Sequence, residues 1–242
     1  MKITLRIWRQ INSTQSGFYE RHELNEVSPN LSILEVLDQL NERLIIAGER
    51  PINFEHDCRE GICGSCGFLV NGQAHGPRAA TSVCQLYLRA FTDGAVLTLD
   101  PWRANSFPLI QDLMVNRSAM DRLIAAGGYC STGTGQAPDG NAMPVGRELA
   151  TSAFDTATCI GCGACVASCR NASASLFVAA KLAHLAQLPQ GQPERAKRAG
   201  ERQSRMEQEG FGSCSSNLEC EAVCPQEISA DWISWMNREQ RS

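Results

Sequence analysis

Alternation of apolar and polar residues opens the chain and predicts a strand. Residues 2–10 repeat with a period of two, as in a strand that is buried on one face. The apolar positions of this pattern are Ile3, Leu5 and Ile7. A turn-rich stretch at 12–17 follows, and residues 18–21 are then expected to return as the antiparallel partner.

A helix is predicted next. Residues 32–44 carry apolar side chains at helical spacing. Ser32 stands where it can cap this helix, and Glu35 follows three residues later, which completes a capping box. The predicted order so far is strand, strand, helix.

Two further strand patterns lie before residue 104. Residues 67–73 are expected to turn back through an Asn71-Gly72 hairpin, and residues 96–99 resemble a closing strand. The insert Ala74–Ala80 is longer than such a hairpin needs, and the sequence suggests no function for it. Asp100-Pro101 then marks the edge of a domain.

The second half of the chain has helical periodicity. Apolar spacing predicts a helix at 109–126, and further helices are predicted at 174–188, which is rich in small residues, at 193–209, which has a polar helix pattern, and at 228–236. A segment rich in Gly, Pro, Ser and Thr at 131–146 is expected to be an ordinary surface loop, in preference to a partner-binding segment.

Two groups of side chains in these helices invite a functional interpretation. The basic residues of 193–209 are predicted to form a solvated face, in preference to one that meets lipid headgroups. They are Arg195, Lys197, Arg198, Arg202 and Arg205. Trp232 and Trp235 are expected to pack in the core and not to relay electrons.

Length and composition narrow the class of protein. The 242 residues suffice for one large or two ordinary domains, and a net charge of −4 gives no reason to expect a nucleic-acid partner. The N-terminus lacks the apolar region and cleavage site of a signal peptide, and no stretch approaches the roughly 20 apolar residues of a membrane span. The 12 cysteines stand largely in clustered motifs, which favours metal binding over disulfides.

The first cysteine motif predicts a [2Fe–2S] cluster. Cys58, Cys63 and Cys66 have the plant-type spacing C-x4-C-x2-C, which needs one distant fourth cysteine. Cys84 supplies it. The intervening glycines let backbone N–H groups approach the cluster sulfurs.

The second and third motifs predict a pair of clusters. Cys159, Cys162, Cys165 and Cys169 follow C-x2-C-x2-C-x3-C, and the run 214–225 repeats this spacing with a trailing proline. In this pattern the last cysteine of each run ligates the other cluster. The expected ligands of a [4Fe–4S] cluster are therefore Cys159, Cys162, Cys165 and Cys224.

The remaining site has one ligand fewer. Cys169, Cys214 and Cys220 supply three thiolates, and Asn217 occupies the position of the fourth. An amide is a poor iron ligand beside thiolates, so a [3Fe–4S] cluster is predicted. Structural zinc is the alternative for paired CxxC motifs, but these runs contain more cysteines than a four-ligand zinc site uses.

These elements and motifs together predict an α+β protein. Strand, strand, helix and cysteine loop is the order of a β-grasp ferredoxin, expected over residues 1–104. An all-α ferredoxin domain with two clusters is expected over 105–242. Cys130 lies outside all three sites and is expected to be a buried, inert thiol. The four histidines are expected to be surface or hydrogen-bonded residues and not ligands: His22, His56, His75 and His184.

The whole arrangement resembles the iron–sulfur subunit of succinate dehydrogenase and fumarate reductase. The resemblance implies a relay from FAD in a flavoprotein subunit, through [2Fe–2S], [4Fe–4S] and [3Fe–4S], to quinone in a membrane anchor that can also hold haem. It also implies a peripheral location on the cytoplasmic face of a bacterial plasma membrane. No dinucleotide fingerprint, P-loop or nucleophile elbow accompanies the clusters, so the catalytic site is expected on the flavoprotein.

One departure from the family pattern concerns the quinone. Ubiquinone-reducing members resemble one another in a tryptophan after the cysteine matching Cys169 and a histidine after the one matching Cys214. Here Arg170-Asn171-Ala172 and Ser215 occupy these places, which favours the menaquinone-linked bacterial members. The motifs are equally compatible with a quinol:fumarate reductase, and another flavin-linked oxidoreductase or a free ferredoxin-type carrier are the rival functions.

Overall fold

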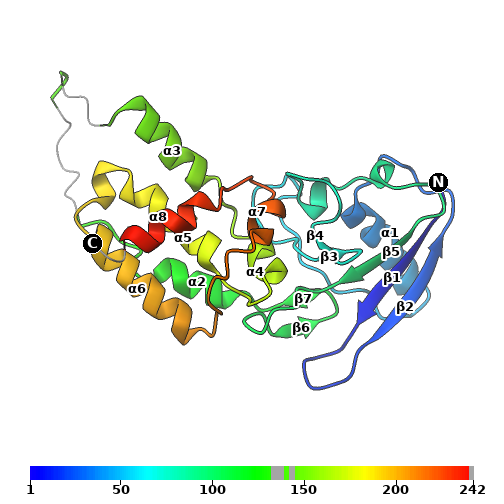
Figure 1. Cartoon of the computed structure of the whole chain (residues 1–242). Coiled ribbons are helices and arrows are strands. Elements are labelled where there is room, and N and C mark those ends of the chain that lie inside the picture. Colours follow the sequence, from blue (N-terminus) through cyan, green and yellow to red (C-terminus); the bar gives the residue numbers. More distant parts are fainter. Residues whose placement is uncertain (132–138, 142–144, 240–242) are drawn as a thin grey trace.

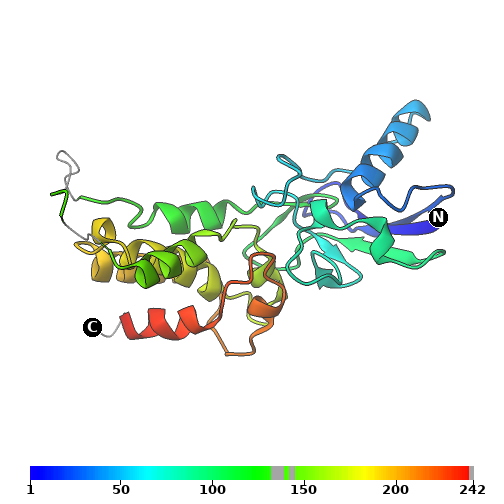
Figure 2. The same ribbon diagram turned by 90° about the horizontal axis from the view of Figure 1, so that it is seen from above.

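The chain folds into two parts that lie side by side in an elongated molecule (Figures 1 and 2). The computed structural model describes residues 1–131, 139–141 and 145–239. The N-terminal part contains a five-stranded sheet, and the C-terminal part is a group of helices (Figure 1). The expected mixture of α and β structure is thereby confirmed.

The sheet of the N-terminal part has the strand order β2-β1-β5-β3-β4. Its elements are β1 (Ile3–Arg9), β2 (Phe18–Leu24), β3 (Leu69–Val70), β4 (Gln73–Ala74) and β5 (Val96–Asp100). β1 pairs antiparallel with β2 and parallel with β5, and β3 pairs antiparallel with both β4 and β5. The predicted alternation along β1 is confirmed, because Ile3, Leu5 and Ile7 are fully buried.

Helix α1 (Ile33–Ile46) covers this sheet with its apolar face. The predicted capping box is present: Ser32 accepts a hydrogen bond from the Glu35 amide, and the Glu35 carboxylate accepts one from the Ser32 amide. The Asn71-Gly72 hairpin is confirmed as well. Both of its residues have positive φ, as a type I′ turn requires.

The C-terminal part is built around α5 (Ser175–Ala186), whose side chains are almost all buried. The surrounding helices are α2 (Ser118–Ala125), α3 (Arg147–Ala157), α4 (Ala164–Ser168), α6 (Arg195–Gln208), α7 (Glu219–Ala222) and α8 (Asp231–Glu239). Short 3-10 turns occur at η1 (Val83–Gln85), η2 (Leu88–Ala90) and η3 (Pro189–Gly191). In the part of the chain that the structure describes, no helix combines the length and the apolar character that crossing a bilayer requires.

One predicted helix is wrong over its first half. Within 109–126 only α2 is helical, and the residues before it form a hairpin of β6 (Leu109–Gln111) and β7 (Met114–Val115). Asp112 at its turn is fully buried, and its carboxylate binds the guanidinium of Arg50 and the amide of Gln10. These contacts to distant segments favour the hairpin over local helical spacing.

The basic face of α6 is also partly different from the prediction. Lys197 is exposed, as expected, and Arg195 and Arg205 are partly exposed, but Arg198 and Arg202 are 1% and 2% exposed. Arg198 donates to the carbonyl oxygens of Gly127, Tyr129 and Gly191, at 2.8, 2.8 and 3.0 Å. Arg202 donates to the last carbonyls of α2. The two arginines therefore stabilise the end of α2 from within the fold.

Three smaller predictions have different outcomes. Cys130 is exposed, so its predicted burial is wrong; it follows directly on the Tyr129 carbonyl that Arg198 holds. Trp232 and Trp235 are half-buried on α8 and contact each other edge to face while packing on the core, as predicted. Most of the expected surface loop 131–146 lies outside the described residues.

Side chains cross between the two hydrophobic cores. Leu113, from the β6–β7 hairpin, packs in the core of the sheet part. Trp102 and Ala74, from the sheet part, pack in the core of the helical part. The two parts are thus joined by shared packing.

Candidate iron–sulfur sites and their junction

The structure brings the first four cysteines together beside the sheet. Cys58, Cys63 and Cys66 lie on the loop that follows α1, and Cys84 lies on η1 (the first cysteine group: Cys58, Cys63, Cys66, Cys84). Cys66 and Cys84 share a side-chain hydrogen bond, which raises the pKa of Cys66 and lowers the pKa of Cys84. Their role as ligands stays a prediction.

Hydrogen-bond donors surround these sulfurs. The Glu60 amide lies 3.3 Å from Cys58 Sγ, and the Ser82 hydroxyl lies 3.2 Å from Cys84 Sγ. The Ser65 hydroxyl lies 3.1 Å from Cys63 Sγ. Burial opposes ionisation of Cys63, but hydrogen bonds from Ser65 and Cys58 outweigh it and lower the pKa of this thiol. The lowered pKa of Cys63 and of Cys84 favours the thiolate, the form that binds iron, at these two positions.

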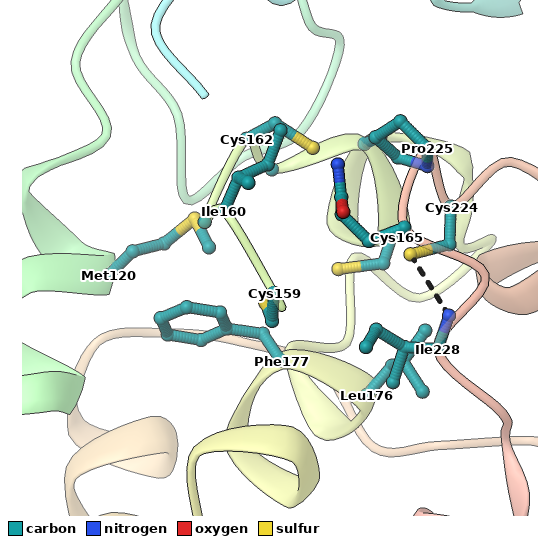
Figure 3. Close-up of a pocket in the computed structure, with 14 residues that line it drawn as sticks. Met120, Cys159, Ile160, Cys162, Cys165, Leu176, Phe177, Cys224, Pro225 and Ile228 are labelled. Atoms are coloured by element: carbon teal, nitrogen blue, oxygen red, sulfur yellow. Dashed lines mark hydrogen bonds between the residues drawn. The ribbon is translucent and has the colours of Figure 1, made fainter. Parts of the chain in front are cut away.

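Four more cysteines line a single cavity in the helical part (the second cysteine group: Cys159, Cys162, Cys165, Cys224). Figure 3 shows the sulfur atoms of Cys162, Cys165 and Cys224 turned toward the same space. Met120, Leu176, Phe177 and Ile228 form apolar walls. The Ile228 amide lies 3.5 Å from the Cys224 sulfur, the contact that is dashed in Figure 3.

Burial dominates the acid–base behaviour of the second group. It raises the pKa of Cys159 and Cys165, and that of Cys162 to about 12. Lys181 on α5 partly opposes this effect at Cys159, whose carbonyl it also binds at 2.7 Å. Four thiolates cannot share this space without cations, so a metal cluster that bound here would displace protons from these thiols.

The third cysteine group lines a neighbouring cavity (Cys169, Cys214 and Cys220). Asn217 lines the same cavity, between Ser216 and Leu218, which both have positive φ. Burial raises the pKa of Cys220 to about 11, and the nearby Cys214 and Cys169 add to this shift. Cys224 thus lines the cavity of the second group and Cys169 that of the third, while their crossed roles as ligands stay a prediction.

The three groups follow one another in space. A methyl group built at Gly64, in the first group's loop, would lie 2.2 Å from the carbonyl oxygen of Ile160 in the second group's loop. On the other side of the second group, Cys165 lies near Cys220 of the third group, and the charge of Cys220 helps to raise the pKa of Cys165. The second group thus lies between the first and the third.

Residues without any spacing signal join the first two loops. Arg117 precedes α2 and donates to backbone carbonyls of both loops, and Trp102 donates from Nε1 to the Cys162 carbonyl at 3.1 Å. His75 contacts Trp102 edge to face and accepts a hydrogen bond at Nδ1 from the Val83 amide, beside Cys84. His75 belongs to the insert Ala74–Ala80, which otherwise seemed without purpose. Only their contacts across the fold identify these residues.

The cysteines do not meet as the ligands of one ion would. Within the described ranges, no three or more His, Cys, Asp or Glu side chains converge on a point suited to a single metal ion. A tetrahedral zinc site requires four ligands at about 2.0–2.3 Å from one centre.

Comparison with known proteins gives the same division of the chain. A family described as "2Fe-2S iron-sulfur cluster binding domain" matches residues 4–122, and one described as "4Fe-4S dicluster domain" matches residues 155–228. The chain is 27% identical over 229 residues to the succinate dehydrogenase iron–sulfur subunit of Bacillus subtilis, covering 92% of this chain and 85% of that one. It is 29% identical over 175 residues to the fumarate reductase iron–sulfur subunit of Wolinella succinogenes, covering 69% and 66%.

A solved structure shares the fold. A chain of the Mycobacterium smegmatis Sdh1 complex in the apo form superposes with a TM-score of 0.73 at 21% identity, covering 99% of this chain and 95% of that chain. The cysteine geometry, both domain matches and the named relatives agree, so the chain belongs to the family of iron–sulfur electron-transfer subunits of succinate dehydrogenase and fumarate reductase.

Proposed function

We propose that this chain carries three iron–sulfur clusters that relay electrons between FAD of a flavoprotein subunit and quinone in a membrane anchor. The observation that carries the proposal is the consecutive arrangement of the three cysteine groups, in which the first touches the second and the second adjoins the third. A bound iron–sulfur cluster accepts and donates single electrons. The chain's own part is to hold, space and insulate such groups.

The first and second groups each offer a complete set of thiols. We propose Cys58, Cys63, Cys66 and Cys84 as ligands of a [2Fe–2S] cluster, which the amide and hydroxyl donors around them support. We propose Cys159, Cys162, Cys165 and Cys224 as ligands of a [4Fe–4S] cluster, which their common apolar cavity supports. Apolar walls exclude water, and their low polarity helps to set the reduction potential.

The third group supports a [3Fe–4S] cluster. Cys169, Cys214 and Cys220 offer three thiols, and Asn217 lines their cavity where a fourth would stand. An Asn217→Cys variant is expected to bind one additional iron and to lose the magnetic signature of a three-iron centre. Unchanged iron content and spectra in that variant would contradict the idea of a missing ligand.

The fold and its boundary fit this assignment. The mixed sheet with α1 packed on it supports a β-grasp ferredoxin domain over 1–104, and the helices around α5 support an α-helical ferredoxin domain over 105–242. Trp102 and Leu113 pack across that boundary in opposite directions. The boundary is therefore a packed interface.

The relatives support the proposed partners and leave two directions of electron flow open. The names of the similar proteins cover both succinate dehydrogenase and fumarate reductase. We propose succinate oxidation as the direction, with fumarate reduction as the second candidate. Ser215 lines the third cavity beside Cys214, and together with Arg170 it favours a menaquinone-type pocket. We place the chain peripherally on the cytoplasmic face of the membrane, held by its anchor.

Low-temperature EPR tests the cluster content. Air-oxidised protein is expected to show a three-iron signal that disappears with dithionite, while two other centres become paramagnetic. Cys224→Ser should remove the [4Fe–4S] signal, whereas Cys130→Ser, at an exposed cysteine outside the groups, should keep all three. Absence of the three-centre pattern in the native protein would refute the relay.

Isolation of the native complex tests the partners. Co-purification with a flavoprotein that holds covalent flavin, together with malonate-sensitive succinate oxidation, is the expected result. A chain that purifies alone would instead indicate a free carrier. A flavoprotein partner without succinate oxidation or fumarate reduction would indicate another flavin-linked oxidoreductase.

A further inference from the structure

The loops of the first two cysteine groups are in direct backbone contact. Besides lying against the Ile160 carbonyl, a methyl group at Gly64 would approach the Cys162 amide nitrogen to 3.1 Å. The first loop contributes residues 58–66 and the second 159–165. With no side chain between them, small movements of either loop change the separation of the two sites.

Arg117 binds both loops at this contact. Its Nη1 donates to the carbonyl of Gly64 at 2.6 Å in the first loop, and to those of Cys162 and Gly161 at 3.1 and 3.3 Å in the second. Its Nη2 donates to the Ser65 carbonyl at 3.3 Å and to the Glu55 carboxylate at 3.2 Å. The side chain is 18% exposed. Arginine suits this position because its planar guanidinium offers five donors in a rigid fork.

Trp102 supplies a second link at the same place. Its Nε1 donates to the Cys162 carbonyl, which Arg117 also binds. Its ring fills the space beside Gly67, where a methyl group would lie 2.5 Å from Cζ2. Trp102 therefore packs on the end of the first loop while it binds the second.

The position of Arg117 also affects the sulfur atoms electrostatically. In a planar trans peptide the C=O and N–H groups point in opposite directions. Arg117 holds the Gly64 carbonyl, and the N–H of the same peptide belongs to Ser65, whose backbone helps to lower the pKa of Cys63. A carbonyl bound by a cation polarises its amide, which strengthens the bond on the other side. The positive charge of Arg117 also stabilises the reduced form of a centre nearby. The negative charge of Glu55, which pairs with Arg117, offsets part of this effect.

We propose that Arg117 is a positioning residue that holds the first two cluster-binding loops in contact and raises the reduction potentials of both centres. The inference rests on the proposed function, because it concerns clusters held by the first and second cysteine groups. It assigns to one side chain both the separation of two successive centres and the potentials of these two centres relative to the third. Trp102 supports the separation alone, since it carries no charge.

Redox-titrated EPR on the full chain in its native complex tests the inference. In Arg117→Gln, the reduction equilibria of the [2Fe–2S] and [4Fe–4S] centres should each shift roughly tenfold toward the oxidised form. The spin–spin interaction between these two reduced centres should weaken as the loops separate. The third centre is the internal reference and should be unchanged, because none of the Arg117 hydrogen bonds reaches its cysteines.

Arg122→Gln is the matched control. Arg122 lies on α2 and carries the same charge, but it pairs with Glu209 and is half exposed. Its removal should leave both potentials and the spin–spin interaction as in the native protein.

Two further variants separate charge from position. Arg117→Lys keeps the charge but cannot reach five acceptors, so the potentials should stay close to native while the interaction weakens. Trp102→Phe should weaken the interaction without moving the potentials. If Arg117→Gln does not retain its clusters, Arg117→Lys tests the inference in its place. A native spin–spin interaction between the two reduced centres in Arg117→Lys would overturn the inference.

The outcomes distinguish the inference from the function beneath it. Arg117→Gln with all three centres present, and with native potentials and interaction, overturns the role of Arg117 and leaves the relay intact. A native protein that lacks the [2Fe–2S] or [4Fe–4S] signal overturns the proposed function and the inference with it.

Discussion

At the scale of single residues, the contact between the two loops depends on the absence of a side chain at Gly64. Its φ is +73°, and a methyl group there would overlap the Ile160 carbonyl. Gly72, at the β3–β4 turn, has φ +76°, but no atom of the described residues lies within 4 Å of such a methyl group. Both glycines therefore adopt a left-handed backbone conformation, but only Gly64 lies against another loop.

This pair predicts unequal effects of one substitution. Gly72→Ala should lower the free energy of unfolding by about 1 kcal/mol, the strain of a left-handed alanine. Gly64→Ala should lower it by at least about 2 kcal/mol more, since the loops must also separate. Denaturant unfolding of the cluster-loaded protein measures both. Equal losses would mean that the loops adjust without strain.

His75 predicts a pH dependence of stability. It is 1% exposed, and burial together with the charge of Arg117 lowers its pKa from 6.5 to about 4. Its Nδ1 accepts a hydrogen bond, and its buried Nε2 has no hydrogen-bond partner among the described residues. The folded protein therefore keeps this ring neutral at pH values where the unfolded chain protonates it.

The sign of the effect follows from this difference. Above pH 6.5 the imidazole is neutral in both the folded and the unfolded state, so its contribution to the free energy of unfolding is fully present. Between pH 6.5 and about 4 only the unfolded chain binds the proton, so stability falls with falling pH, by up to roughly 3 kcal/mol. Unfolding of the loaded protein at several pH values measures the slope, which should be shallower in His75→Gln. Identical slopes would show that another group titrates.

At the scale of elements, the end of α2 depends on a buried arginine of α6. Arg198 satisfies three carbonyls, and Glu194 lies 3.6 Å from its guanidinium. Arg198→Met should therefore cost about 3–5 kcal/mol, because three buried carbonyls lose their donor and Glu194 loses its cation. Lys197→Met, at the neighbouring position with 65% exposure, should change stability by about 0.5 kcal/mol or less. Comparable losses in both would restore the prediction of a solvated face.

The elements also show where local periodicity suffices. The capping box of α1 and the Asn71-Gly72 hairpin are confirmed because their interactions join residues a few positions apart. The helix predicted from residue 109 is wrong because Asp112 is held by Arg50 and Gln10, 62 and 102 residues away. The spacing of apolar residues within one segment contains no information about partners so far away in the sequence.

At the scale of the whole molecule, the helical part should depend on its clusters for order. α4 has five residues and α7 has four, lengths at which isolated helices are not stable in water. Both adjoin cysteines of the second and third groups. The sheet part has its own apolar core around α1.

Removal of iron tests this dependence. Chelation under reducing conditions should increase hydrogen exchange in α4 and α7 first, whereas β1 and β5 should stay protected. Hydrogen exchange followed by mass spectrometry, with untreated protein as reference, measures the order. Simultaneous loss of protection in both parts would show that the packed interface couples them into one folding unit.

The sequence by itself determined the cysteine groups, the order of most elements and the family. Those features can be recognised from residues a few positions apart, because thiols that bind one cluster must recur at fixed intervals along a loop. Only the tertiary structure decided the junction of Arg117, Trp102 and His75, the burial of Arg198 and Arg202, and the exposure of Cys130. The physical reason is distance along the chain: Arg117 acts on carbonyls 44 to 53 residues away, and a carbonyl is present at every residue, so no pattern of side chains reveals it.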